Sequence, residues 1–136
     1  DMVAANGVIY SPSAFFRCRY NDTYALVENG EEKMPQTEQS IREKQYKWAR
    51  LKKNMPLMPV YSAFGGLTIY KYDALKDCKY SVLKNEDPRV GVRCEHFALC
   101  KQMREKGYDR IFINPAMKVV YGSYGLERLW SKLCRR

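Results

Sequence analysis

Residues 95–113 read EHFALCKQMREKGYDRIFI and carry the clearest structural signal in the chain. Apolar residues recur every three positions in the first part of this segment, which predicts one inward face of a helix over 95–106. The residues of that face are Phe97, Cys100 and Met103. Gly107 follows as a C-cap, and the apolar run 111–113 predicts a buried strand. A helix that leads into a buried strand is typical of α/β folds.

A second helix is predicted on the N-terminal side of this segment, from Thr37 to about Lys53. Its apolar positions are spaced by seven, three and four residues, so they form one stripe, and basic residues occupy the opposite face. The stripe contains Ile41, Trp48, Leu51 and Met55, and the basic face contains Arg42, Lys44, Lys47, Arg50, Lys52 and Lys53. Pro56 stops the helix, because the residue before a proline is pushed away from helical geometry.

Short β-rich and helical segments make up the rest of the pattern. The β-rich segments are 3–10, up to a turn signal at Asn6-Gly7, then 67–70 and 117–121, and the helical segments are 72–75 and 126–133. A polar loop is predicted over 84–93, and Asn114-Pro115 is predicted to end the strand that begins at Ile111. This order of strands and helices predicts the α/β class.

The composition limits the kind of protein that the chain can be. It has 136 residues, with 24 Lys plus Arg against 15 Asp plus Glu, and a formal net charge of +9. Such a length supports one domain over 1–136 and excludes a two-domain enzyme. No apolar run approaches the roughly 18–20 residues that cross a bilayer, so we expect no membrane segment in this chain. A secretory lumen and a viral or microbial cytoplasm both remain open as its location.

The five cysteines are expected to be mostly buried free thiols. They are Cys18, Cys78, Cys94, Cys100 and Cys134. No two of them form a Cys-x-x-Cys pair and the chain has one histidine, which argues against a zinc site. A single disulfide, such as one between Cys78 and Cys94, is the alternative in an oxidising compartment.

Four short motifs follow one another along most of the chain. They are Asn6-Gly7, Tyr20-Asn21-Asp22-Thr23-Tyr24-Ala25-Leu26, Ala63-Phe64-Gly65-Gly66-Leu67 and Cys94-Glu95-His96. In this order they resemble the acceptor-side half of GT-A glycosyltransferases, in particular the fungal capsule-associated mannosyltransferase type and related viral and microbial enzymes. The resemblance covers residues 1–121. It implies a GT-A-like mixed sheet flanked by helices, and transfer of a sugar from a nucleotide-sugar donor to a glycan acceptor.

Glu95 is the residue that the resemblance assigns to catalysis. A carboxylate near the acceptor hydroxyl can act as a general base or as a hydrogen-bond acceptor that orients the hydroxyl. The macrodipole and the free backbone N–H groups at a helix N-terminus favour its charge. Position alone favours a capping role for this glutamate, and the neighbouring motifs favour catalysis.

The resemblance places further residues at the acceptor or the donor, namely His96, Phe64, Gly65, Gly66, Asp22, Thr23 and Asn6. His96 is the one histidine, so imidazole chemistry has to use it, although a lone histidine is more often structural. The glycine pair allows close approach of a ligand to the backbone and equally suits an ordinary turn. Asp22 and Thr23 lie among tyrosines, which suits a sugar face or a local turn.

One feature of GT-A enzymes is missing from the sequence. These enzymes hold a divalent metal, Mn or Mg, and the donor diphosphate with an Asp-x-Asp motif, and no such motif occurs here. In the resembling proteins this motif and the donor-binding half lie upstream. We therefore expect 1–136 to be the acceptor-side part of a larger domain, with the metal ligands outside this chain except for a contribution from His96.

Two other functions remain as alternatives. The charge of +9 and 11 tyrosines could serve a nucleic-acid-binding module, by phosphate contacts and base stacking. Against this, the basic residues are spread along the chain and show no recognition-motif spacing, so a nucleic acid partner is not expected. The second alternative is a non-catalytic interaction protein built on a glycosyltransferase-like remnant.

Overall fold

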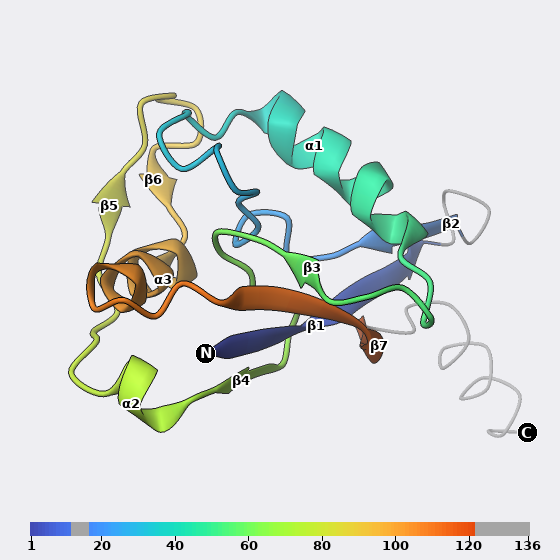
Figure 1. The fold of residues 1–136 in the computed structure, drawn as a ribbon. Coiled ribbons are helices and arrows are strands. Elements are labelled where there is room, and N and C mark those ends of the chain that lie inside the picture. The colour runs from blue at the N-terminus through green and yellow to red at the C-terminus, as the bar shows by residue number, and fades with distance from the viewer. Residues whose placement is uncertain (12–16, 122–136) are drawn as a thin grey trace, which may run out of the picture.

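The computed structural model describes residues 1–11 and 17–121 (Figure 1). Its strands are β1 (Met2–Ser11), β2 (Arg17–Tyr20), β3 (Met58–Pro59), β4 (Thr68–Tyr70), β5 (Leu83–Lys84), β6 (Val92–Arg93) and β7 (Ile111–Tyr121). Its helices are α1 (Glu38–Lys47), α2 (Tyr72–Leu75) and α3 (Glu95–Glu105), and a 3-10 turn, η2 (Trp48–Arg50), continues α1. The predicted helix over 126–133 and Cys134 lie outside the described residues.

Five of these strands form one mixed sheet, in the order β2-β1-β7-β3 with β4 also paired to β1. β1 and β7 run parallel, whereas β2, β3 and β4 pair antiparallel with their neighbours. Figure 1 shows α1 beside β2, and shows α3, α2 and the β5–β6 hairpin gathered near the other end of the sheet, where β1 starts. The predicted α/β class is confirmed as a mixed sheet with helices.

The two long strands continue through the turn signals inside them, so these two predictions are wrong. β1 runs past Asn6-Gly7, and β7 runs past Asn114-Pro115. Their register jumps from the pair Ala5↔Asn114 to the pair Asn6↔Lys118, which leaves 115–117 unpaired with β1. A bulge of this kind tolerates a proline, because the proline needs no ladder hydrogen bond there.

The hydrophobic core joins the sheet to α2, α3 and η2. Its buried members are Met2, Ala4, Tyr20, Leu26, Trp48, Val60, Ala63, Ala74, Cys100, Met103, Ile111 and Ile113. Full burial of each large apolar side chain contributes about 1.5–3 kcal/mol. Cys100 and Met103 are its members on α3, and the Cys100 Sγ lies 3.5 Å from the Met2 Sδ on β1, so the core holds against the sheet the helix that carries part of the site described below.

The prediction for α3 is confirmed, including its inward face and its C-terminus. Phe97, Cys100 and Met103 are buried. Gly107 has a φ of +86°, and its N–H donates to the carbonyl of Arg104 at 2.9 Å. The N–H of Tyr108 donates to the Met103 carbonyl at 3.0 Å. These two bonds form a Schellman motif, which satisfies carbonyls that the helix end leaves free.

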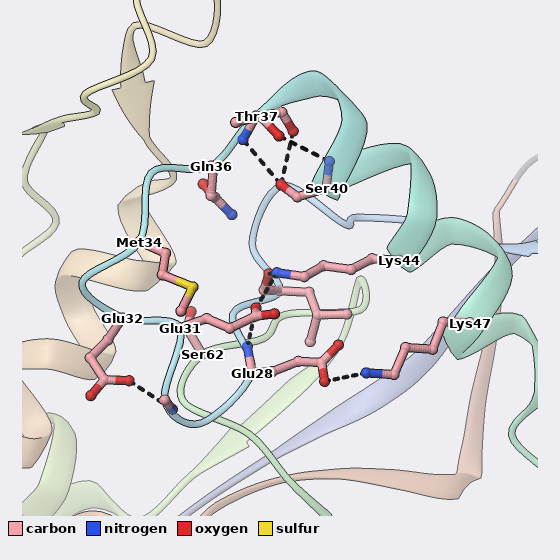
Figure 2. Close-up of polar contacts among 12 residues, drawn as sticks. Glu28, Glu31, Glu32, Met34, Gln36, Thr37, Ser40, Lys44, Lys47 and Ser62 are labelled. Atoms are coloured by element: carbon pink, nitrogen blue, oxygen red, sulfur yellow. Dashed lines mark hydrogen bonds and ion pairs between the residues drawn. The ribbon is translucent and has the colours of Figure 1, made fainter.

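α1 begins where the sequence predicts but ends earlier. Thr37 is the N-cap: its hydroxyl accepts from the N–H of Ser40 at 3.1 Å, and the Ser40 hydroxyl accepts from the N–H of Thr37 at 3.0 Å (Figure 2). This reciprocal pair is a capping box. The α-helix ends at Lys47 and η2 ends at Arg50, so the predicted extension to Lys53 is wrong and Met55 is exposed.

The prediction that Lys44 lies on an exposed basic face is also wrong. Its side chain is buried, and its Nζ donates to the carbonyl of Leu26 at 3.1 Å and pairs with Glu31 Oε2 at 2.6 Å. Figure 2 shows Lys44 reaching from α1 toward Glu31. Position 44 lies three residues after Ile41 and four before Trp48, so helix geometry turns it inward. Its long apolar stem packs in the interior while the ammonium reaches polar partners.

We expect Lys44→Met to lower the free energy of unfolding by about 1–3 kcal/mol, because the buried carbonyl of Leu26 would lose its donor. Loss of the ion pair adds little, since the Glu31 side chain is partly exposed. Urea unfolding of the purified variant measures the change. Arg42→Met, at an exposed position of α1, is the matched control and should stay within about 0.5 kcal/mol of the wild type. Equal changes in both variants would contradict a stabilising role for the Lys44 bond.

The shorter predicted segments have mixed outcomes. β4 confirms the β-rich run at 67–70, and α2 confirms the helical turn at 72–75. The predicted loop 84–93 is paired at its ends, where β5 and β6 form an antiparallel hairpin. Among residues 1–11 and 17–121, no helix is long and apolar enough to cross a membrane.

The described cysteines are free thiols, and two of them are buried. Burial raises the pKa of Cys94 to about 12 and that of Cys100 to about 11. Cys78 is free as well, so the alternative of a disulfide between it and Cys94 does not hold in this structure. Thiols with such pKa values stay protonated at neutral pH, which makes them unreactive as nucleophiles.

Candidate functional site

Asp22 occupies a tight turn directly after β2, where its backbone has a φ of +46°. The carbonyl of Asp22 accepts from the N–H of Ala25 at 3.2 Å, which closes the turn. The carboxylate Oδ2 accepts from the backbone N–H of Gly65 at 3.2 Å. Burial raises the pKa of this carboxyl, although the Gly65 N–H opposes the shift. Asp22 therefore belongs to a local turn and also presents a carboxyl to a segment 43 residues away.

The glycine pair at 65–66 crosses β1 at very short range, and we call this contact the glycine crossing. A Cβ placed on Gly65 would lie 2.0 Å from the carbonyl oxygen of Ala5, and one placed on Gly7 would lie 2.6 Å from the carbonyl oxygen of Gly65. A Cβ on Gly66 would lie 2.2 Å from the hydroxyl of Tyr121. Contacts within the protein thus require these glycines. The crossing also holds the Gly65 N–H in place against the half-buried carboxyl of Asp22.

His96 lies between two aromatic rings at the start of α3. Its ring stacks on Phe64, with a centroid distance of 4.1 Å and an interplanar angle of 12°. Tyr80 approaches it nearly at right angles, with a centroid distance of 5.6 Å. The His96 side chain is 10% exposed, and its Nδ1 is buried without a hydrogen-bond partner among the described residues. Buried polar atoms are normally paired, so this nitrogen is an exception among the described residues.

Glu95 is the first residue of α3, and its side chain is 55% exposed. Its own backbone N–H lowers the pKa of its carboxyl, and the thiol of Cys94 and the charge of His96 act in the same direction. The Cys94 Sγ donates to Glu95 Oε2 at 3.4 Å, and Glu95 Oε1 lies 3.9 Å from His96 Nε2. Glu95 is therefore an ionised and accessible carboxylate at neutral pH, next to a histidine.

Five of the residues predicted for the site come together in the structure, and we call them the Asp22–Glu95 site. They are Asp22, Phe64, Gly65, Glu95 and His96. Phe64, the neighbour of the glycine that bonds Asp22, stacks on His96, and this links the turn of Asp22 to the start of α3. Burial raises the pKa of the half-buried Asp22 carboxyl, and the backbone N–H of Glu95 lowers the pKa of the exposed Glu95 carboxyl. Divergent acids of this kind are typical of sites that move protons.

Two other predicted residues have different surroundings. Thr23 is buried next to Asp22 in the turn. Asn6 is 3% exposed, and it lines a separate pocket of about 190 Å³ with Cys18, Leu51 and Lys53. None of the five residues of the Asp22–Glu95 site lines that pocket. The structure therefore does not group Asn6 with the two acids.

Sequence reasoning did not identify two tyrosines at the site. Tyr80 contacts His96 from the loop between α2 and β5, and Tyr121 lies over Gly66 from the end of β7. Burial raises the pKa of the Tyr121 hydroxyl, and the charge of Asp22 adds to the shift. Tyr80 stands in no motif, and its position follows from tertiary contacts alone. The sequence predicts Tyr121 only as the last residue of the strand 117–121.

The described residues do not fit a divalent metal. Within 1–11 and 17–121, no three His, Cys, Asp or Glu side chains are grouped so that they could hold an ion. His96 has one carboxylate oxygen at 3.9 Å, and its ring is packed between aromatic rings. Mn²⁺ and Mg²⁺ need several oxygen ligands at short range, which these side chains do not supply.

Comparisons with protein families, with characterised proteins and with solved structures found no match to this chain. The site is therefore interpreted from its own geometry.

Proposed function

We propose that the chain is the acceptor-side half of a GT-A-like glycosyltransferase, which moves a sugar from a nucleotide-sugar donor to a glycan acceptor. The observation that carries the proposal is the convergence of Glu95, His96 and Asp22 from two distant parts of the chain. An exposed, ionised carboxylate beside a mostly buried second acid and aromatic rings suits a sugar hydroxyl. The order of the four sequence motifs and the mixed sheet are consistent with this assignment.

Glu95 acts on the acceptor in this proposal. One carboxylate oxygen accepts the proton of the acceptor hydroxyl as the hydroxyl oxygen forms a bond to the anomeric carbon of the donor sugar. The bond from the anomeric carbon to the phosphate oxygen breaks at the same centre, and the nucleoside diphosphate leaves with the electron pair. Asp22 and the aromatic rings orient the acceptor and limit the access of water. The Gly65 N–H keeps Asp22 in position.

The donor and its metal are held elsewhere in this proposal. Because the described side chains do not fit an Mn or Mg site, no step of the reaction is assigned to a metal on these residues. The partner is the donor-binding half of the same domain, which the resemblance places upstream.

Donor turnover tests this proposal. The full-length protein that carries this chain is incubated with a panel of UDP- and GDP-sugars and Mn or Mg, and release of the nucleoside diphosphate is measured with and without glycan acceptors. We expect at least one donor to be cleaved, at a rate that rises with the acceptor concentration. No release by a folded protein across the panel would overturn the enzyme assignment. Salt-sensitive binding of a short oligonucleotide at physiological salt would instead favour the nucleic-acid alternative.

A further inference from the structure

Tyr80 is an exposed aromatic residue whose backbone neighbour is held in place. Tyr80 as a whole residue is 62% exposed. The side-chain amide of Gln102 on α3 makes two hydrogen bonds to the backbone of Lys79. Its Oε1 accepts from the Lys79 N–H at 3.0 Å, and its Nε2 donates to the Lys79 carbonyl at 2.7 Å. The β5–β6 hairpin fixes the chain a few residues further on. The backbone on both sides of Tyr80 is thus held in place.

This ring lies at the edge of the Asp22–Glu95 site. It meets His96 at an angle of 89°, and His96 lies next to the exposed carboxylate of Glu95. Of the exposed tyrosines Tyr46, Tyr72 and Tyr80, Tyr80 is the one whose ring contacts the histidine beside Glu95. The buried Nδ1 of the same histidine has no hydrogen-bond partner in the described part of the chain, whereas such atoms are normally paired.

A pyranose ring has the chemistry that this arrangement requires. Its C–H face packs against an aromatic ring, and its hydroxyl groups donate to carboxylates and to an imidazole nitrogen. The accessible carboxylate of Glu95 lies beside His96 and would repel a carboxylate or phosphate on the ring. The net charge of +9 attracts anions only at long range, and salt screens that field beyond about 8–10 Å.

On the basis of the proposed function, we propose that Tyr80 is the stacking platform for the acceptor and that the acceptor residue bound there is a neutral pyranoside. Tyr80 positions the sugar ring and leaves the proton transfer to Glu95. The ring of Tyr80, and not its hydroxyl, supplies the contact.

Saturation-transfer NMR on the full-length protein tests the proposal without turnover. The probes are neutral methyl glycosides, of mannose, galactose and N-acetylglucosamine, and methyl glucuronide as the anionic counterpart. We expect at least one neutral glycoside to bind through its C–H face at millimolar concentration and the glucuronide to bind at least about fivefold more weakly. Equal binding of the neutral and anionic glycosides would overturn the assignment of a neutral acceptor.

Matched variants locate the contact. Tyr80→Ala should weaken binding of that glycoside about five- to tenfold, whereas Tyr80→Phe should bind it as the wild type does. Tyr72→Ala is the control, because Tyr72 on α2 is 75% exposed and makes no ring contact with His96. In turnover, Tyr80→Ala should raise the KM for the acceptor by the same factor and leave the KM for the donor unchanged.

The outcomes separate this inference from the function on which it rests. If the wild type releases the nucleoside diphosphate but Tyr80→Ala binds the glycosides as well as the wild type does, then Tyr80 is not the stacking platform and the proposed function stands. If the wild type cleaves no donor, the proposed function fails and the platform fails as an acceptor site with it. Loss of binding in Tyr80→Phe as well as in Tyr80→Ala would overturn the assignment of the contact to the ring.

Discussion

Glu95→Gln lowers the acceptor-dependent kcat by about 10²- to 10⁴-fold, the range in which general-base catalysis contributes. Glutamine keeps the size of the side chain and a carbonyl oxygen that accepts a hydrogen bond, but this oxygen cannot take a proton at neutral pH. The variant therefore distinguishes a role of Glu95 as a general base from a role in which it only orients the acceptor hydroxyl. Steady-state measurement of nucleoside diphosphate release, at a saturating acceptor concentration, gives the change in kcat.

The pH profile provides a second readout of the same substitution. The backbone N–H of Glu95, together with Cys94 and His96, lowers the pKa of the carboxyl. Protonation removes a base, so kcat/KM should fall only below the ordinary range of a glutamate. The acidic limb that Glu95 causes should be missing from Glu95→Gln. A stability effect alone would lower the activity at every pH and leave that limb in place.

Glu105→Gln is the matched control for this prediction. Glu105 is the last residue of α3, its side chain is 62% exposed, and it pairs with Lys101 at 3.9 Å. An exposed pair of this kind contributes about 0–1 kcal/mol to stability, so the control should keep both its fold and its activity. Unchanged turnover by Glu95→Gln would remove Glu95 from catalysis and leave it a capping role at the helix N-terminus.

The local part of the fold could be predicted from the sequence. The inward face of α3 and its end at Gly107 follow from spacing and from the conformational freedom of glycine, both of which are local properties. The N-cap of α1 at Thr37 is local in the same sense. Such signals involve residues within a few positions of one another, so tertiary packing rarely changes them.

Predictions failed where tertiary contacts outweigh a local signal. The pairing of β1 with β7 carries both strands through Asn6-Gly7 and Asn114-Pro115, since a bulge absorbs the irregular stretch. Lys44 looked like a surface residue because it is charged, but its position between Ile41 and Trp48 turns it inward to the Leu26 carbonyl. The helical spacing of a charged residue does not show that another segment places a buried hydrogen-bond acceptor next to it.

The site was predicted as a set of individual residues without their arrangement in space. Glu95 and His96 are adjacent in sequence, so their proximity needed no fold. The bond from Gly65 to Asp22 and the contact of Tyr80 with His96 join segments that the sequence does not relate. Long-range contacts of this kind depend on the path of the whole chain, and neither motif spacing nor hydrophobic period encodes them.

Gly65→Ala should lower the free energy of unfolding by about 3–5 kcal/mol, the largest effect on stability that we expect. Two costs combine at this position. The backbone of Gly65 has a φ of +66°, which an alanine adopts only with strain. The new Cβ would also lie 2.0 Å from the carbonyl oxygen of Ala5, so the backbone of β1 or of the crossing has to move. Urea unfolding measures the loss.

Two other glycines separate these costs. Gly107 has a φ of +86° with nothing within 4 Å of an added Cβ, so Gly107→Ala measures the strain alone, about 1 kcal/mol. A Cβ on Gly7 would meet the carbonyl oxygen of Gly65 at 2.6 Å without a positive φ, so Gly7→Ala measures the contact alone, about 1–3 kcal/mol. The loss in Gly65→Ala should be at least the sum of the two. A loss no larger than that of Gly107→Ala would contradict the close glycine crossing.

The same variants connect stability to the site. When the crossing opens, the N–H of Gly65 moves away from Asp22 Oδ2, and the half-buried carboxyl loses the bond that opposes its raised pKa. Gly7→Ala opens the crossing from the β1 side and leaves the sequence of the site intact. We therefore expect it to lower the acceptor-dependent turnover at temperatures where it is still folded, whereas Gly107→Ala, at the far end of α3, should lower stability without changing turnover. Full turnover by folded Gly7→Ala would show that the position of Asp22 does not depend on the glycine crossing.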